Sequence, residues 1–277
     1  MRLPPAQLPT LLAALGLTLL FALEGVAPAA GGRRQHLRHT LRNLALGGIG
    51  SVVVKALLGG TLAAVMVWAE NRSFGLLRMV SLPPLVATAA AIVLFDAWMY
   101  FWHRANHECN FLWRFHRVHH SDSEMDASTA IRFHAGELLL STILRLAVIP
   151  LLGISVGQLL LYETLLLPVI LFHHSNVRLP ESWDRALRWL IVTPELHRVH
   201  HSRLRPETDS NYASIFSIWD RLAGSFRLRP GTRPVNFGLE EFSEEMWQRF
   251  PKLLLIPFAS SAKRSPLLRR FSQLLQR

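Results

Sequence analysis

Long apolar stretches restrict the fold of this sequence more than any other feature. Four of them approach or exceed the roughly 20 apolar residues that a helix needs to cross a bilayer, at about residues 8–30, 44–68, 82–102 and 138–172. Because the hydrocarbon offers no water to backbone amides, each stretch must form a helix. Half of the 277 residues are hydrophobic and only 18% are charged. We therefore predict an all-α integral membrane protein that forms one domain over residues 1–277.

Two of these stretches need further interpretation. The fourth is too long for one helix and has Pro150 and Gly153 at its middle, which predicts a helical hairpin with both ends on one side. The first ends in a signal-like Ala-Pro-Ala-Ala sequence, but only Arg2 precedes it as a basic residue and Glu24 interrupts it, so we expect a retained helix. Together the stretches predict four to five membrane-embedded helices, with Lys55 unusually placed inside the second.

Positive charge is unevenly distributed between the stretches. The net charge is +11, and the connection between the first two stretches holds Arg33, Arg34, Arg38 and Arg42. The positive-inside rule places this connection in the cytoplasm. Counting the crossings onward brings the segment after the third stretch and both ends of the hairpin to the cytoplasmic side, and we expect a bacterial inner membrane. Scattered juxtamembrane charge does not favour nucleic-acid binding.

Histidine spacing is the strongest chemical signal. The pattern H-x-x-H-H occurs twice among the 13 histidines, as His116, His119, His120 and as His197, His200, His201; His103 and His107 are four apart, and His173 and His174 end the hairpin. Spacings of three and four place side chains on one face of a helix. A single cysteine, Cys109, excludes a four-cysteine cluster, so any metal must be bound by histidine and carboxylate. We therefore predict a cytoplasmic helical cap that carries these histidine boxes.

So many imidazoles imply two metal ions, since a structural zinc ion needs only four ligands. No H-E-x-x-H motif of a zinc protease is present, because Phe111 stands where its second histidine would be. Iron suits a paired, redox-active centre beside lipid, although zinc could replace it in a purified sample. His134 is either a ligand or part of an ion-paired helix start, and His173 is a ligand or the neighbour of one. His36 and His39 are expected to be hydrogen-bonded interfacial residues outside the site.

Four ordered segments resemble the sterol desaturase and fatty acid hydroxylase superfamily over residues 90–226. They are residues 96–107, 113–121, 172–176 and 197–202, followed by Asn211-Tyr212 and residues 218–222. The resemblance implies a non-haem di-iron monooxygenase or desaturase that consumes O₂. It also implies that the metal ligands are His103, His107, His116, His119, His120, His174, His197, His200 and His201. Asn176 stands where some members have a further histidine.

The surroundings of the ligands can also be predicted. Asp96 precedes His103 by seven residues, so we expect its carboxylate to orient that imidazole. The arginines within the boxes, Arg104, Arg117 and Arg198, are expected to point toward phospholipid headgroups. Residues 260–277 read as a basic amphipathic helix lying on the membrane surface.

These features favour an O₂-dependent lipid hydroxylase or desaturase, with an acyl, sterol, sphingolipid-like or carotenoid substrate that arrives from the bilayer. The alternative is a non-redox metal-binding membrane protein or a zinc-dependent lipid-processing enzyme. The sequence has neither a dinucleotide-binding G-x-G-x-x-G segment after a strand nor a haem-attachment C-x-x-C-H motif. Electrons must then come from other chains, namely a reductase and a carrier resembling cytochrome b5 or ferredoxin.

Overall fold

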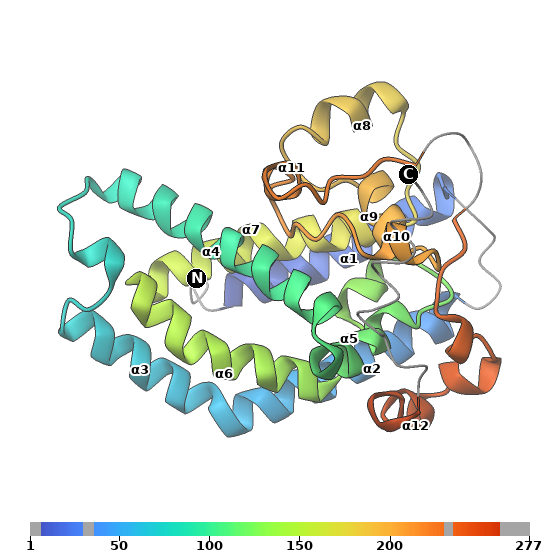
Figure 1. The fold of residues 1–277 in the computed structure, drawn as a ribbon, viewed down its shortest axis with the longest axis horizontal. Helices are drawn as coiled ribbons and strands as arrows, with labels where there is room; N and C mark the ends of the chain where they lie inside the picture. Colours follow the sequence, from blue (N-terminus) through green and yellow to red (C-terminus); the bar gives the residue numbers. More distant parts are fainter. Residues whose placement is uncertain (1–6, 30–35, 230–234, 261–277) are drawn as a thin grey trace, which may run out of the picture.

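The computed structural model describes residues 7–29, 36–229 and 235–260, and Figure 1 shows their arrangement. Five helical segments within them are long and apolar enough to cross a membrane. They are built from α1 (Leu8–Val26), α2 (His36–Val54) with α3 (Gly60–Asn71), α4 (Pro84–Glu108), α6 (Ala135–Leu152) and α7 (Val156–His174). The described residues form isolated β-bridges but no strands. The protein is therefore an all-α integral membrane protein, as predicted, while the predicted tail helix lies outside the described residues.

The long helices pack side by side and the short helices gather at one end of them (Figure 1). Helix α1 packs on α7, α2 and α3 pack on α6, and α4 contacts both α6 and α7. The cap at one end contains α5 (Asn110–His120), α8 (Glu181–Leu187), α9 (Pro194–His200), α10 (Arg205–Thr208), α11 (Ile218–Leu222) and α12 (Phe250–Leu253). Because α4 and α7 end in this cap, the histidines at their C-terminal ends enter it as well.

The predicted hairpin is present. Helix α6 ends at Gly153, whose φ of 76° is the left-handed conformation that glycine adopts without strain. Ser155 then caps α7, since its hydroxyl accepts from the Gln158 amide while the Gln158 side chain accepts from the Ser155 amide. Pro150 lies in the last turn of α6. Gly153 therefore ends α6 and Ser155 starts α7, and the other end of each helix faces the cap.

The second predicted span differs from the structure at its start. Helix α2 begins at His36 rather than near residue 44, and a π-helical segment, Lys55–Gly59, joins it to α3. Arg38 and Arg42, which the sequence placed in the connection before this span, are therefore part of the helix itself, as is His39. Their polar side chains do not end the helix because the cap supplies partners for them; Arg42, for example, donates to the Gln248 carbonyl at 2.8 Å.

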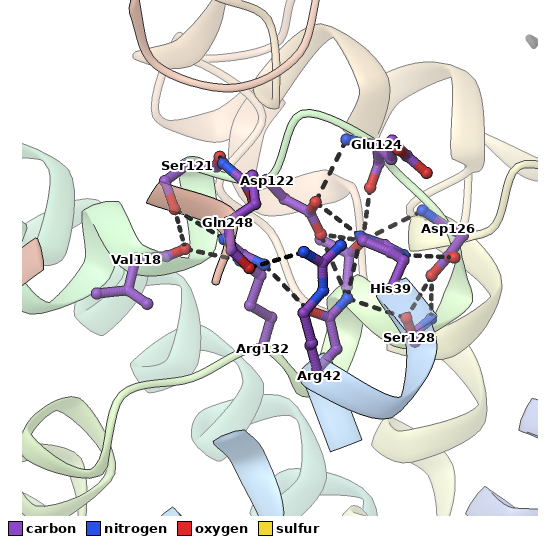
Figure 2. A network of polar contacts seen from close by, with 12 residues as sticks. His39, Arg42, Val118, Ser121, Asp122, Glu124, Asp126, Ser128, Arg132 and Gln248 are labelled. Atoms are coloured by element: carbon purple, nitrogen blue, oxygen red, sulfur yellow. Dashed lines mark hydrogen bonds and ion pairs between the residues drawn. The ribbon is translucent and has the colours of Figure 1, made fainter. Parts of the chain in front are cut away.

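A buried polar network joins α2 to the segment after α5 (Figure 2). Both ring nitrogens of His39 face carboxylates, at 2.7 Å from Asp122 and 2.8 Å from Asp126. Carboxylates only accept hydrogen bonds, so both nitrogens donate and the ring is an imidazolium. His39 is a buried hydrogen-bonded residue, although the sequence placed it at the membrane interface.

Arg132 is the second centre of the same network, and its side chain is fully buried. It donates to the Val118 carbonyl, the Asn43 amide oxygen, the Ser121 hydroxyl and the Gln248 amide oxygen at 3.0–3.1 Å. Burying a charge is tolerated only when its donors are satisfied. The network therefore fixes the C-terminal end of α5 against α2.

Two of the three arginines within the histidine boxes stabilise the cap instead of reaching for lipid. Arg117 is buried and donates to the Ile256 and Ala259 carbonyls at 2.5 and 2.7 Å. Arg198 donates to the Val177 carbonyl at 2.6 Å, and the prediction that both side chains face headgroups was therefore wrong. Arg104 pairs with Glu108 at 3.0 Å on the surface of α4.

The turn before α4 depends on a glycine. Gly75 has a φ of 114°, and a Cβ atom there would lie 2.3 Å from the Pro150 carbonyl oxygen. Gly75→Ala should therefore lower the midpoint of thermal unfolding in detergent by at least about 3 °C, through strain and steric clash. Gly48→Ala is the matched control, since nothing lies within 4 Å of its added Cβ. Equal midpoints for the two variants would contradict this account of the turn.

Candidate metal centre

Nine histidines of the cap and adjoining helix ends form two groups. The five-histidine group contains His103, His107, His116, His120 and His200, and the four-histidine group contains His119, His174, His197 and His201. One nitrogen from each ring lies within 4.8 Å of those of every other member of its group. These nine are the residues that the sequence motifs indicated as ligands, and in space they converge on two points.

Each H-x-x-H-H box divides its three histidines between the two groups. On α5, His116 and His120 belong to the five-histidine group while His119 belongs to the four-histidine group. In the second box the order is reversed, because His200 alone joins the five-histidine group. Residues four apart lie above one another on a helix, and the residue three along is displaced around the axis. Each box therefore contributes to both groups.

Backbone carbonyls orient two rings of the five-histidine group. The Nδ1 of His103 is 2.8 Å from the Tyr212 carbonyl, and the Nδ1 of His200 is 2.7 Å from the Ser210 carbonyl. A carbonyl only accepts, so each Nδ1 carries the proton and each Nε2 keeps its lone pair. The ring of His174 is held in the same way by the Ile170 carbonyl, at 2.7 Å.

A carboxylate orients a third ring of the same group, and a second carboxylate lies near a fourth. The Nδ1 of His116 is 2.7 Å from Glu137 Oε1, and the Nδ1 of His107 is 3.6 Å from Asp209 Oδ1. Such partners fix the tautomer of a metal-binding imidazole and increase its basicity. The sequence pointed to Asp96 first for this role, whereas the structure places Glu137 and Asp209 beside the rings.

Asp96 contacts the backbone segment that holds a ring, not the ring itself. Its two oxygens accept from the Tyr162 hydroxyl, the Trp219 indole and the amides of Ile215 and Phe216 at 2.8–3.2 Å. The prediction that Asp96 orients His103 directly was therefore wrong. It instead fixes the segment 211–216, from which the Tyr212 carbonyl reaches that ring.

Asp220 holds the same segment at its other end. Its carboxylate accepts from the Tyr212 amide at 2.7 Å and from the Ala213 amide at 3.0 Å. Backbone carbonyls have no side-chain signature, so the sequence could not identify Tyr212 and Ser210 as partners of the rings. The signal that the sequence did contain was the pair of acidic residues Asp96 and Asp220. A buried carboxylate must accept hydrogen bonds from nearby donors, which here are backbone amides of this segment.

Burial keeps these imidazoles neutral. Removal from water lowers the pKa of His119, His120, His197 and His201, and it lowers the pKa of His200 to about 3. Neutral rings retain the lone pair that a metal ion requires. Among the described residues no hydrogen-bond partner is found for the buried Nε2 atoms of His103, His120, His200 and His201.

The remaining contacts place nitrogen against nitrogen. The Nε2 atoms of His107 and His116 are 3.1 Å apart, and the Nε2 of His174 lies 3.1 Å from that of His119 and 2.9 Å from that of His197. Buried acceptors that face one another need a cation or a shared proton between them. The donor set therefore fits two metal ions of the kind that imidazole favours, such as zinc, copper or iron.

Three less certain candidates lie outside both groups. His134 is the N-cap of α6, because its Nδ1 accepts from the Gly136 amide at 2.9 Å; this is the helix-start alternative, without an ion pair to Glu137. His173 is buried with its ring centroid 4.1 Å from that of His197. Asn176 donates through its backbone amide to Glu24 at 2.8 Å.

A cavity of about 380 Å³ connects the two groups to the membrane-spanning helices. His103 and His116 line it from one group, and His119, His174 and His197 from the other. Its apolar walls come from α6 and α7, including Leu138, Leu166, Leu167, Ile170 and Leu171. The candidate metal centre therefore faces a space that suits an apolar chain.

Comparison with known proteins identifies the family. Residues 88–225 match the family model described as fatty acid hydroxylase. Ornithine lipid hydroxylase of Rhizobium tropici is 31% identical over 157 residues, which cover 57% of this chain and 46% of that protein. Alkylglycerol monooxygenase of Danio rerio is 35% identical over 56% of this chain and 36% of its own length. Cholesterol 25-hydroxylase of Rattus norvegicus is 27% identical over 54% and 49%.

The matched region thus spans less than half of each of these three relatives. No solved structure matches this chain significantly. The family match over residues 88–225 includes all nine clustered histidines. The chain therefore belongs to the fatty acid hydroxylase family, within the superfamily that its histidine motifs indicated.

Proposed function

We propose that this protein is an O₂-dependent lipid hydroxylase, with one iron ion held by each histidine group. The observation that carries the proposal is the convergence of nine histidines, eight of them buried and His103 partly buried, on two points beside a largely apolar cavity. Imidazole ligands suit iron, and a pair of redox-active ions suits attack on an unactivated C–H bond. We assign the activity to residues 90–226, which contain all nine histidines.

The ligand roles follow from the ring contacts. In this proposal Tyr212, Ser210 and Glu137 hold Nδ1 protons of the five-histidine group, so that Nε2 atoms face the ion. Bound iron would supply the redox chemistry that activates O₂. The surrounding side chains exclude water, which protects a strong oxidant from side reactions. The partners that orient the rings are thus backbone carbonyls of the cap and a carboxylate of α6.

The substrate class is a membrane lipid. Most of the cavity wall is apolar and much of it lies on helices that cross the membrane, so a lipid could reach the histidines without passing through water. The names of the three relatives refer to different lipids, namely an ornithine lipid, an alkylglycerol and cholesterol. This variety supports lipid hydroxylation as the shared chemistry and leaves the substrate to be identified by experiment.

We further propose that the histidine groups face the cytoplasm of a bacterium, at its inner membrane. The arginines near the start of α2 support this orientation through the positive-inside rule. A reductase and a carrier resembling cytochrome b5 or ferredoxin would then deliver electrons to the cap from the same compartment.

The function is tested by lipid profiling of cells with and without the gene under heavy-isotope dioxygen. We expect one lipid class to gain the mass of a single isotopically labelled oxygen atom only when the protein is present. The His200→Ala variant should lose this product, because a ligand of the five-histidine group is removed. Identical lipid profiles in all strains would refute hydroxylation, and loss of two hydrogens without oxygen would indicate a desaturase.

Metal content tests the ligand assignment separately. Purified wild-type protein should contain two iron ions, one for each histidine group, and His200→Ala should lower this content toward one. The control is His134→Asn, which keeps a side-chain acceptor at the N-cap of α6 and should retain both ions. Elemental analysis distinguishes the results. Two zinc ions that do not respond to reductant would support the non-redox alternative instead.

The single cysteine tests the orientation. Cys109 is exposed and lies between α4 and α5, two residues after His107. A membrane-impermeant maleimide should leave it unlabelled in intact cells and label it in inverted membrane vesicles. Cys109→Ser provides the background signal. Labelling in intact cells at the level seen in inverted vesicles would place the histidine groups outside the cytoplasm.

A further inference from the structure

A charged pair lines the cavity on its membrane side. Arg145 of α6 and Glu163 of α7 both lie in membrane-spanning segments and both line the cavity. The Arg145 Nη1 is 3.5 Å from Glu163 Oε1, and the two side chains are 20% and 34% exposed. Ionisable residues at this depth are costly and usually mark a functional site. Neither residue contributes to the histidine groups.

The pair satisfies little of its own hydrogen-bonding capacity. A guanidinium has five N–H donors, yet Arg145 has one long carboxylate contact and a 3.4 Å contact to the Met99 sulfur. Its Nε is buried without a hydrogen-bond partner in the described part of the chain. By contrast, Arg188 meets Asp184 at 2.7 Å in the cap. A structural ion pair in an apolar setting would be expected to close as tightly as this.

The pair is also within reach of the histidines. Met99, which the Arg145 guanidinium touches, lies one helical turn before His103 on α4. Arg145 itself is eight residues beyond Glu137 along α6, or about 12 Å at 1.5 Å per residue. One bound molecule can therefore contact the pair and the histidine groups together.

The charges define which chemical group fits between them. Arginine only donates hydrogen bonds and an ionised glutamate only accepts them. A hydroxyl can accept from Arg145 and donate to Glu163, whereas a carbonyl can satisfy Arg145 alone and an anion would be repelled by Glu163. A plain hydrocarbon tail would cover both charges and leave them desolvated, which is unfavourable.

We propose that Arg145 and Glu163 bind a hydroxyl group of the lipid, on the membrane-interior side of the carbon presented to the histidines. This inference rests on the proposed function and narrows its substrate class to a lipid with an alcohol group. The hydroxyl fixes how far the lipid enters the cavity, so the pair selects the carbon that is attacked.

The test uses three ligands that differ only at one end: octadecanol, its methyl ether and octadecane. Each is added to the purified holoprotein at the same mole fraction in detergent, and the midpoint of thermal unfolding is measured. Ligands that bind the folded state raise this midpoint by mass action. We expect octadecanol to raise it more than the other two, because the ether cannot donate to Glu163 and the alkane offers no polar atom.

The double variant Arg145→Met/Glu163→Met should remove this preference and weaken octadecanol binding at least about ten-fold, because the hydroxyl loses both of its hydrogen bonds to charged groups. Removing both charges leaves neither one stranded. The matched control is Arg185→Met/Glu181→Met, which removes a pair of the same 3.5 Å separation that is exposed on the cap. The control should keep the wild-type preference for octadecanol.

Equal stabilisation of the wild-type protein by all three ligands would overturn the inference, whatever the variants do. So would a double variant that still prefers octadecanol. Metal content measured on the same samples separates the two proposals. Wild-type protein with two ions and no preference for the alcohol refutes only the role of the pair, whereas a preference without bound metal refutes only the proposed function.

Discussion

The structure depends on gathering nine imidazoles, eight of them buried, with their lone pairs facing inward. Each ring is a polar group taken out of water beside a lipid bilayer, and this is tolerable only if one nitrogen finds an acceptor and the other a cation or proton. The acceptors are the carbonyls of Tyr212, Ser210 and Ile170 and the carboxylate of Glu137. Tyr212 and Ser210 belong to the cap, whereas Glu137 and Ile170 lie on the membrane-spanning helices α6 and α7.

Much of that support is indirect. Asp96 and Asp220 bind backbone amides of the segment 211–216, which in turn presents the Tyr212 carbonyl to His103. His39 and Arg132 connect the end of α5 to α2 through two carboxylates and several polar groups (Figure 2). These contacts link the membrane helices to the cap, so the position of the rings depends on both parts of the protein.

The sequence predicted the features that repeat or that need a certain length. Apolar length identified the spans, Pro150 and Gly153 identified the hairpin, and histidine spacing identified the nine clustered residues. It did not predict the start of α2 or the contacts of Arg117, because these depend on carbonyls of segments far away in the chain. The role of Asp96 was misjudged for the same reason. Helical spacing indicates which side chains share a face, but it does not indicate which distant backbone amides will reach them.

The division of each box between the two groups has a geometric consequence. Because His119 and His120 are consecutive residues of α5 yet belong to different groups, the spacing of the two centres is set by the rigid backbone of a single helix. The second box, which begins on α9 and ends at its C-cap His201, also contributes to both groups. Neither group can shift without disturbing the other. The distance between them is set by the geometry of the helix that carries histidines of both.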